Sequence, residues 1–377
     1  MVEITGGSSQ SARGRMPTGL RVCQAKGNKI LLENGRWYTD WVMGSHGAIY
    51  GYAPDWWVKA LSSAAEWGQS ASIGCTDERI VAEMIAQFYP DIEAVRFMCT
   101  GSDPCAASIK LARAITGRDK LLVYGYHGTN QVFCTPPEVS GTTIDMRRGT
   151  LQADRDAFVP LPWDPTEQTF SALNKQIAAV IIEIPSVTGF GDLVIRDWLR
   201  SLFSRARDLG VLVILDEVKT GFRYGRSGAA GLYDLHGLVD LYCFGKTLGN
   251  GYPISCLAGK KDILKELTNG VHFSGTFFGE PIGLALAKAT LRQLMVEQPW
   301  EYLYTMGDEL MRSWNRSYEA VHLQGHCMRP ELSGSKEMIA RFVQTYFDYG
   351  HIVAQSPWYV TTATTMKDIG DLTCQSL

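Results

Sequence analysis

The sequence predicts an α/β protein, with a large domain (residues 48–298) and a smaller α+β domain made from both chain ends (1–47 and 299–377). Three observations support this fold class. From about residue 77, continuous apolar runs alternate with amphipathic helical segments, which is typical of a mostly parallel sheet covered on both faces. Near the N-terminus, two β-prone runs flank Asn34-Gly35, a strong short signal for a hairpin. After about residue 296 the pattern changes to helices with few strands.

The strands of the hairpin are expected at about 28–33 and 36–41. The large domain is expected to contain helices at 77–88, 103–116 and 198–209, and strands at 94–98, 120–124, 178–182, 211–215, 240–244 and 255–258. The C-terminal part is expected to contain helices at 300–318 and 336–347, and strands at 352–354 and 359–362. The strands of the large domain are predicted from runs such as Ala178-Ala179-Val180-Ile181-Ile182, which suit burial on both faces.

The composition is that of a globular protein, with 45% hydrophobic and 20% charged residues. The 36 Lys and Arg nearly balance the 39 Asp and Glu, and the net charge of −3 gives no electrostatic reason to expect nucleic acid or an anionic membrane as partner. We expect neither a signal peptide nor a membrane span, because no apolar run approaches roughly 20 residues. The nine cysteines form no Cys-x-x-Cys pair and the seven histidines show no ligand spacing, so reduced thiols, a cytoplasmic protein and no metal site are expected.

Residues suited to a functional site come just past several predicted strands. They are Gly101, Tyr126, Glu183, Asp216 and Lys246. The carboxyl ends of parallel strands meet at one edge of a sheet, and ligands of open α/β sheets bind there. The sequence therefore predicts that these residues gather in one site.

The segment Gly101-Ser102-Asp103-Pro104 leads into a predicted helix. Ser102 is expected as the N-cap, and Pro104 suits the first turn, where its missing N–H costs nothing. The free amides and the helix dipole at this position suit a phosphate, and Gly101 lets the backbone approach it closely. Taken alone, this pattern more often marks a capped helix without a ligand.

The most informative pair is Asp216, which ends an apolar strand, and Lys246, which stands in the glycine-rich turn that begins Phe244-Gly245. Pyridoxal phosphate needs an amine to bind its aldehyde and an acid to keep its ring nitrogen protonated. The apolar residues before Lys246 favour burial, which makes an amine nucleophilic. A nucleotide-binding P-loop is excluded, because Asp240 occupies the position of its first glycine. The pair therefore predicts amine chemistry with pyridoxal phosphate.

Three further side chains are candidates for contacts with this cofactor. Val218 comes two residues after Asp216, so we expect it on the same side, where it can press on the ring. Tyr126, in Tyr126-His127-Gly128, suits either stacking on a flat ring or an ordinary core position. Thr276 precedes another predicted helix, and its hydroxyl is a candidate phosphate ligand.

Together these segments resemble the class III pyridoxal-phosphate-dependent aminotransferases, nearest the group around glutamate-1-semialdehyde 2,1-aminomutase. The resemblance runs from about Asp77 to Gln293. The motifs that carry it include Gly101-Ser102-Asp103, Thr116-Gly117-Arg118-Asp119-Lys120, Tyr126-His127-Gly128, Asp216-Glu217-Val218-Lys219-Thr220-Gly221-Phe222-Arg223, and Phe244-Gly245-Lys246 through Gly251-Tyr252-Pro253. It implies a fold-type-I protein whose large domain has a mostly parallel seven-stranded sheet.

The resemblance also implies how the cofactor is held. Lys246 would form the Schiff base with it and move the proton during the reaction. Asp216 would bind the ring nitrogen, while Val218 and Tyr126 would pack on opposite faces of the ring.

Other positions acquire roles from the same resemblance. Gly101 and Ser102 would bind the cofactor's phosphate. Thr276 would complete the phosphate site of the neighbouring subunit, which implies a homodimer. Glu183 and His46 correspond to family positions near the substrate.

The function expected from these residues is transfer of an amino group from an amine or amino acid to an oxo or aldehyde acceptor. Two alternatives stay open: an intramolecular aminomutase of the glutamate-1-semialdehyde type, and a non-catalytic dimer that binds pyridoxal phosphate. The cofactor motifs match the family closely, but other positions depart from it. Lys219 stands where the family often has Gln or Met, and Ser102-Asp103-Pro104 replaces the common Thr-Glu-Ala.

Overall fold

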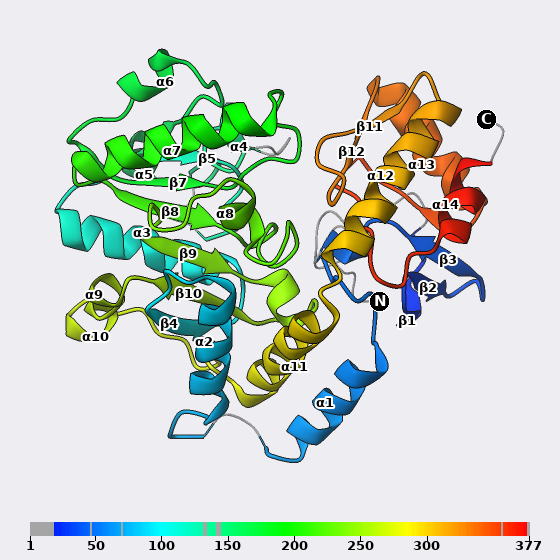
Figure 1. Cartoon of the computed structure of the whole chain (residues 1–377), viewed down its shortest axis with the longest axis horizontal. Coiled ribbons are helices and arrows are strands. Elements are labelled where there is room, and N and C mark those ends of the chain that lie inside the picture. The colour runs from blue at the N-terminus through cyan, green and yellow to red at the C-terminus, as the bar shows by residue number, and fades with distance from the viewer. Residues whose placement is uncertain are drawn as a thin grey trace. The chain divides into compact units, whose positions relative to one another are not determined.

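The computed structural model describes residues 19–45, 47–68, 71–130, 134–140, 145–355 and 357–374. The chain divides into two compact units. One unit consists of residues 59–298, and the other combines residues 1–58 with 299–377. Each unit has its own sheet (Figure 1).

Residues 59–298 form a seven-stranded sheet with the strand order β4-β10-β9-β8-β7-β5-β6. The strands are β4 (Ala94–Met98), β5 (Lys120–Tyr124), β6 (Phe158–Pro160), β7 (Ile177–Ile182), β8 (Leu212–Asp216), β9 (Leu241–Phe244) and β10 (Ser255–Gly259). Only β10 runs antiparallel to its neighbours. The prediction of a mostly parallel, seven-stranded α/β fold is therefore confirmed.

The central strands are buried on both faces, as their composition requires. All six residues of β7 are buried. Buried residues of the helix α3 (Ser102–Thr116) share one apolar cluster with β7, β8 and β9 side chains, and α7 (Asp192–Asp208) packs against β8. A strand without a polar face folds stably only in such a covered sheet.

The other helices of this part of the chain are mostly short. They are α1 (Asp55–Ala65), α2 (Asp77–Phe88), α4 (Pro137–Ser140), α5 (Gln152–Ala157), α6 (Glu167–Ser171), α8 (Gly228–Leu232), η4 (Lys246–Gly249), α9 (Lys261–Leu264), α10 (Glu266–Asn269) and α11 (Pro281–Glu297). The long helix α11 begins at Pro281 because Glu280 caps it: the Glu280 carboxylate accepts from the amides of Ile282 and Gly283.

The second unit joins the two ends of the chain through a small sheet. Its strand order is β1-β2-β3-β13, and the C-terminal β13 pairs in parallel with β3. The elements of this unit are β1 (Val22–Lys26), β2 (Lys29–Leu32), β3 (Trp37–Asp40), η3 (Met43–Ser45), α12 (Trp300–Ser317), β11 (His322–Gln324), β12 (Glu331–Ser333), α13 (Lys336–Asp348), β13 (His351–Ile352) and α14 (Met366–Thr373).

The predicted hairpin around Asn34-Gly35 is confirmed, since β2 and β3 pair antiparallel on either side of it. The strand predicted at 359–362 is wrong. Its backbone is not part of a ladder: the Tyr359 amide donates to the Trp41 carbonyl, and the Thr362 amide donates to the Ile49 carbonyl. The short strands β1, β6, β11 and β12 were not predicted.

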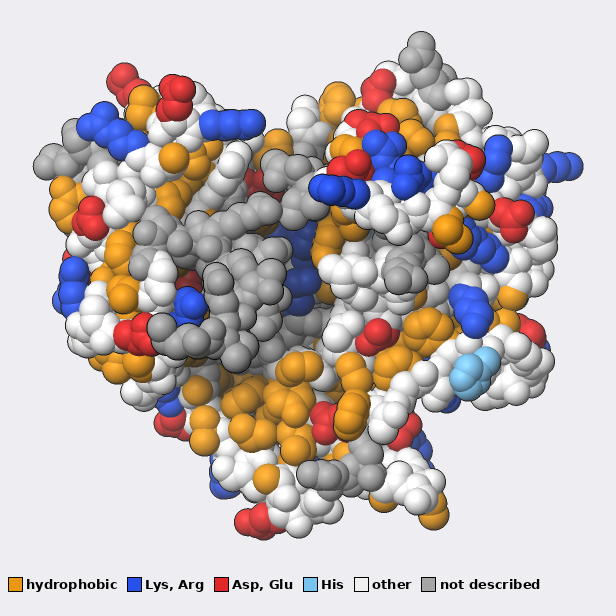
Figure 2. Space-filling model, turned by 180° about the vertical axis from the view of Figure 1, so that it is seen from behind, with side chains coloured by type: hydrophobic (Ala, Val, Ile, Leu, Met, Phe, Trp, Pro, Cys, Tyr) orange, Lys and Arg blue, Asp and Glu red, His pale blue; other side chains and the backbone are white. Residues whose placement is uncertain are grey.

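Several global properties follow from the described residues. Among their helices, none is both long and apolar enough to cross a membrane. All nine cysteines are free thiols. Figure 2 shows side chains of both charge signs interspersed over the face that it displays.

Candidate active site

The register of four parallel strands brings the predicted strand-end residues to one edge of the sheet. Tyr124 on β5 pairs with Ile182 on β7, and Ile182 pairs with Leu215 on β8. Asp216, the next residue on β8, pairs with Cys243 on β9. Glu183 and Asp216 therefore lie side by side at the strand ends, with Tyr126 and Lys246 just beyond the strands on either side.

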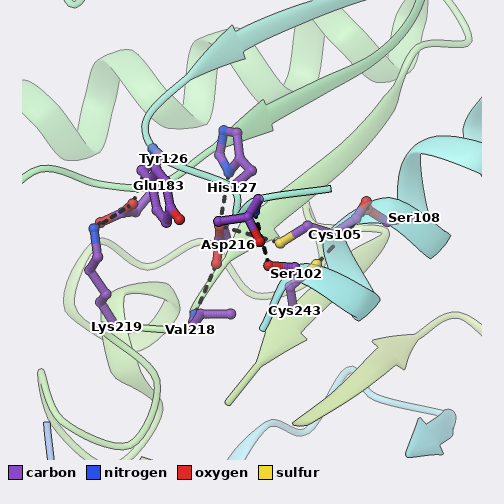
Figure 3. A network of polar contacts seen from close by, with 11 residues as sticks. Ser102, Cys105, Ser108, Tyr126, His127, Glu183, Asp216, Val218, Lys219 and Cys243 are labelled. Carbon is purple, nitrogen blue, oxygen red and sulfur yellow. Dashed lines mark hydrogen bonds and ion pairs between the residues drawn. The ribbon is translucent and has the colours of Figure 1, made fainter. Parts of the chain in front are cut away.

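The Asp216 carboxylate is buried, and both of its oxygens contact neighbouring groups (Figure 3). Its Oδ1 accepts from the Val218 amide at 3.0 Å. Its Oδ2 lies 2.8 Å from Nδ1 of His127 and 3.4 Å from Sγ of Cys105 on α3. Three contacts on a buried carboxylate hold it in one orientation, with its charge stabilised by hydrogen bonds.

His127 and Cys105 were given no role by the sequence, and both touch Asp216. Their ligand atoms and those of Asp216 lie within 4.8 Å of one another, a grouping that could also hold a metal ion. No spacing rule could have found it, because the three residues come from three separate segments. His127 could have been found from the sequence, since it follows Tyr126 directly in the motif Tyr126-His127-Gly128.

Lys246 begins the one-turn helix η4 with a φ of 40°, which is uncommon for a residue other than glycine. Such a conformation costs of order 1–3 kcal/mol and is most often found at functional sites. Burial is the main cause that lowers the pKa of Lys246 to about 8, and the ammonium of Lys219 acts in the same direction. A larger fraction of this amine than of an ordinary lysine is therefore neutral, and nucleophilic, at neutral to mildly alkaline pH.

Bare backbone lines the start of α3. A Cβ placed on Gly101 would lie 2.6 Å from Cγ1 of Val218, and a Cβ on Gly128 would lie 2.1 Å from Oγ of Ser102. Gly128 also has a φ of +108°, which favours glycine. These contacts show why glycine is needed at both positions, beside a helix N-terminus, which is a position where an anion binds well.

The prediction that Ser102 caps α3 is wrong. Gly101 is the N-cap, and Ser102 is the first helical residue. The Ser102 hydroxyl accepts from the Thr129 amide at 3.1 Å, while Oδ2 of Asp103 accepts from the Thr100 amide at 2.7 Å. The carboxylate of Asp103 thus binds the backbone amides that precede the helix. The hydroxyl of Ser102 instead links the helix to the loop after Tyr126.

Glu183 connects Tyr126 to Lys219. Oε2 of Glu183 accepts from the Tyr126 amide at 3.2 Å, and both of its carboxylate oxygens contact Nζ of Lys219, at 2.7 and 2.9 Å. The same Nζ lies 5.6 Å from the centre of the Tyr126 ring. Figure 3 shows these three side chains next to one another at the strand ends.

Two predicted site residues are not brought into this cluster. Thr276 is exposed in the turn 276–279, before α11. His46 lies outside the described residues.

The residues present fit pyridoxal phosphate. The cluster provides a nucleophilic amine, a buried acid at the end of the neighbouring strand, and a helix N-terminus for a phosphate. Tyr126 and Val218 supply a ring and an apolar side chain, the groups that commonly flank a flat heterocycle. The fold and this cluster define an enzyme of fold type I that uses pyridoxal phosphate.

Comparisons with known proteins identify the family. The family model Aminotransferase class-III matches residues 10–322. Similar curated proteins include glutamate-1-semialdehyde 2,1-aminomutase from Methylacidiphilum infernorum (isolate V4), 32% identical over 306 residues, with 77% of this chain and 68% of the relative covered. The enzyme of the same name from Halorubrum lacusprofundi is 31% identical over 320 residues, with coverage of 81% and 70%. The chain belongs to the class-III aminotransferase family.

Solved structures agree on the fold. An omega-transaminase from Sphaerobacter thermophilus superposes with a TM-score of 0.85 at 20% identity, covering 98% of this chain and 92% of that chain. A structure described as a transaminase with PLP bound gives a TM-score of 0.83 at 21% identity, with coverage of 98% and 92%. The protein is thus a pyridoxal-phosphate-dependent enzyme of this family.

Proposed function

We propose that this enzyme is an aminotransferase that moves an amino group from an amine or amino acid to an oxo or aldehyde acceptor, with Lys246 as the residue that binds the cofactor. The observation that carries the proposal is the position of Lys246. Its amine has a pKa lowered to about 8 and stands beyond β9, next to the strand that ends in the buried Asp216.

When bound, pyridoxal phosphate withdraws electrons from the substrate carbon that carries the amine. Lys246 would hold the cofactor at its aldehyde through the side-chain amine, and once freed by the amino donor this amine would move a proton at the substrate carbon as general base and acid. Asp216 is held in one orientation by His127, Cys105 and the Val218 amide. Its carboxylate would pair with the ring nitrogen of the cofactor and keep that nitrogen protonated.

The remaining contacts place and shield the cofactor. Gly101 and Ser102 bind the phosphate at the N-terminus of α3, where the helix dipole favours an anion. Val218 and Tyr126 pack on the two faces of the ring. Glu183 supports Tyr126 through its amide and stands near the substrate.

We also propose a homodimer. Thr276 is exposed in the turn before α11, where its hydroxyl is accessible to a second copy of the chain. In this arrangement Thr276 completes the phosphate site of the neighbouring subunit. His46 is proposed as a further substrate contact from its sequence position alone.

Borohydride reduction tests the role of Lys246. The cofactor-saturated protein is reduced and digested, and the modified peptide is identified by mass spectrometry. We expect a cofactor adduct in the peptide that contains residues 241–251, and no adduct at this position in Lys246→Ala. An adduct at another lysine, or none from saturated wild-type protein, would refute the assignment.

The intramolecular aminomutase is a second candidate, favoured by the curated relatives, which carry that name at 31–32% identity. A requirement for a second amino donor separates the two reactions. An aminomutase completes many turnovers of one substrate without a donor, whereas an aminotransferase stops after one. If neither reaction is found and amines do not alter the absorbance of the bound cofactor, the protein is the non-catalytic alternative.

A further inference from the structure

A second lysine, Lys219, stands at the same edge of the sheet as Lys246. Asp216 on β8 pairs with Cys243 on β9, and each lysine comes three residues after its member of this pair. The two amines are therefore carried by neighbouring strand ends. Like charges so placed disfavour each other's protonated form.

Glu183 holds the ammonium of Lys219 in place. Both carboxylate oxygens contact Nζ, at 2.7 and 2.9 Å, and the side chain of Glu183 is only 6% exposed against 24% for Lys219. The carboxylate is itself oriented by the Tyr126 amide, and the ring of Tyr126 lies within cation–π distance of Nζ. These contacts hold Nζ of Lys219 beside Glu183, at the end of β7.

Resting on the proposed role of Lys246, we propose that Lys219, held in place by Glu183, is a positioning residue that disfavours the protonated form of Lys246, so that more of its amine is ready to attack a carbonyl carbon. Lys219 acts as a fixed positive charge and needs no contact with the reacting atoms. Glu183 keeps this charge in place, while its own negative charge acts on Lys246 in the opposite direction. The two members of one ion pair therefore act on Lys246 with opposite sign.

The charges around Lys246 agree with this assignment. Burial is the largest cause of its lowered pKa, and Lys219 is the next. Glu183, Asp216 and Cys105 face the same amine and raise its pKa. Among the described charged groups that act on Lys246, Lys219 is thus the one that opposes protonation.

The test measures the protonation of Lys246 directly in cofactor-free protein. The rate at which acetic anhydride acetylates Lys246 is followed against pH by mass spectrometry of the peptide that carries it. Wild-type protein is expected to show a midpoint near pH 8. Lys219→Met removes the positive charge and leaves Glu183 unpaired, so the midpoint should rise by at least about one pH unit.

Glu183→Gln is the opposing variant. It removes a charge that favours protonation and leaves Lys219 positive, so the midpoint should fall below that of wild type. Lys219→Arg keeps the charge and should stay close to wild type, and the double variant Lys219→Met/Glu183→Gln should return towards it. A merely structural role for the ion pair would move both single variants in the same direction or not at all.

An unchanged or lowered midpoint in Lys219→Met, or a raised midpoint in Glu183→Gln, overturns the proposal. If Lys219→Met does not fold, as judged by circular dichroism, the direction of the Glu183→Gln shift decides alone. Borohydride trapping is independent of this measurement. An adduct at Lys246 without the opposite shifts would reject the role of Lys219 and leave the proposed function intact.

Discussion

The two units of this protein are stabilised in different ways. In residues 59–298 the carboxyl ends of the strands carry buried charged groups, with Glu183, Asp216 and Glu217 each no more than 5% exposed. Packed aromatic side chains occur in both units, in residues 59–298 around Tyr89, Phe222 and Phe244, but the second unit contains a cluster of them that includes no residue of the proposed site. Its members are Trp314, Tyr318, Phe342, Tyr346 and Trp358.

This difference separates the sources of stability and of chemistry. Buried charges reduce stability unless each is hydrogen-bonded, but they can shift pKa values and so create reactive groups. Buried aromatic rings contribute large apolar areas and favourable ring contacts, and no titratable group near neutral pH. Substitutions of the buried charged groups at the strand ends should therefore reduce the rate of the reaction most. Substitutions of the buried aromatic rings should reduce the free energy of unfolding most.

The largest effect is expected for Lys246→Ala. The variant lacks both the nucleophile and the group that moves the proton, so the rate of amino transfer should fall by at least about 1,000-fold. Steady-state kinetics with an amine donor and an aldehyde acceptor provide the measurement. Lys265→Ala is the control, because its exposed amine pairs only with the exposed Asp262, and its rate should equal that of wild type. Substantial activity in Lys246→Ala would contradict the proposal that the strand-end groups of residues 59–298 carry out the reaction.

Trp314→Ala tests the aromatic cluster. The indole is fully buried and donates through Nε1 to the Val321 carbonyl at 2.8 Å. Its removal should lower the free energy of unfolding by about 3–5 kcal/mol in urea titrations. Trp37→Ala, at a position 45% exposed in the same unit, should change it by less than about 1 kcal/mol. Equal losses in the two variants would show that the cluster has no special part in stability.

Two buried aspartates allow a sharper test within residues 59–298. Asp216→Asn should reduce the rate of amino transfer by about 100- to 1,000-fold, since the charge that stabilises the protonated ring is lost. Asp240 is buried as well, but it pairs with Lys260 and accepts from the Val213 amide at 2.8 Å. Asp240→Asn should therefore lower the free energy of unfolding and leave the rate nearly unchanged. Similar losses of rate in Asp216→Asn and Asp240→Asn would mean that the rate depends on burying a carboxylate and not on its position in the proposed site.

A smaller effect is expected from two glycines with similar backbone angles. Gly128 and Gly149 have φ values of +108° and +87°, but a Cβ on Gly149 meets nothing within 4 Å, whereas one on Gly128 meets Ser102. Gly149→Ala should cost about 1 kcal/mol of unfolding free energy from backbone strain alone. Gly128→Ala should cost more and should also weaken cofactor binding, measured by absorbance titration. Equal cofactor affinities in the two variants would contradict the phosphate role of Ser102.

The sequence was informative wherever a local pattern determined the structure. The central strands were predicted nearly to the residue, because apolar runs without a polar face require burial on both sides. The hairpin was predicted from Asn34-Gly35 for a similar reason. Short or exposed strands such as β1 and β6 carry no such pattern, and the segment 359–362 has strand-forming residues whose backbone bonds go to separate segments.

The site was predictable in part. That Asp216 and Lys246 follow strands could be read along the chain, and the register of β8 and β9 then places them together. The contact of Cys105 with Asp216 joins residues 111 positions apart, and the pair between Glu183 and Lys219 joins residues 36 apart. No periodicity connects such positions. The side chain of Ser102 was also misassigned, because the helix begins one residue earlier than expected and the Ser102 hydroxyl accepts from the Thr129 amide.

By itself, the sequence determined the class of fold, the residues that end each strand and the chemistry that those residues can perform. These properties depend on neighbours a few positions away, which fix apolar periodicity and turn conformation. Only the tertiary structure decided which charges face one another, and hence that Lys246 shares its site with a second, clamped lysine. That outcome depends on strand order and register, which arise from packing the whole sheet rather than from any local segment.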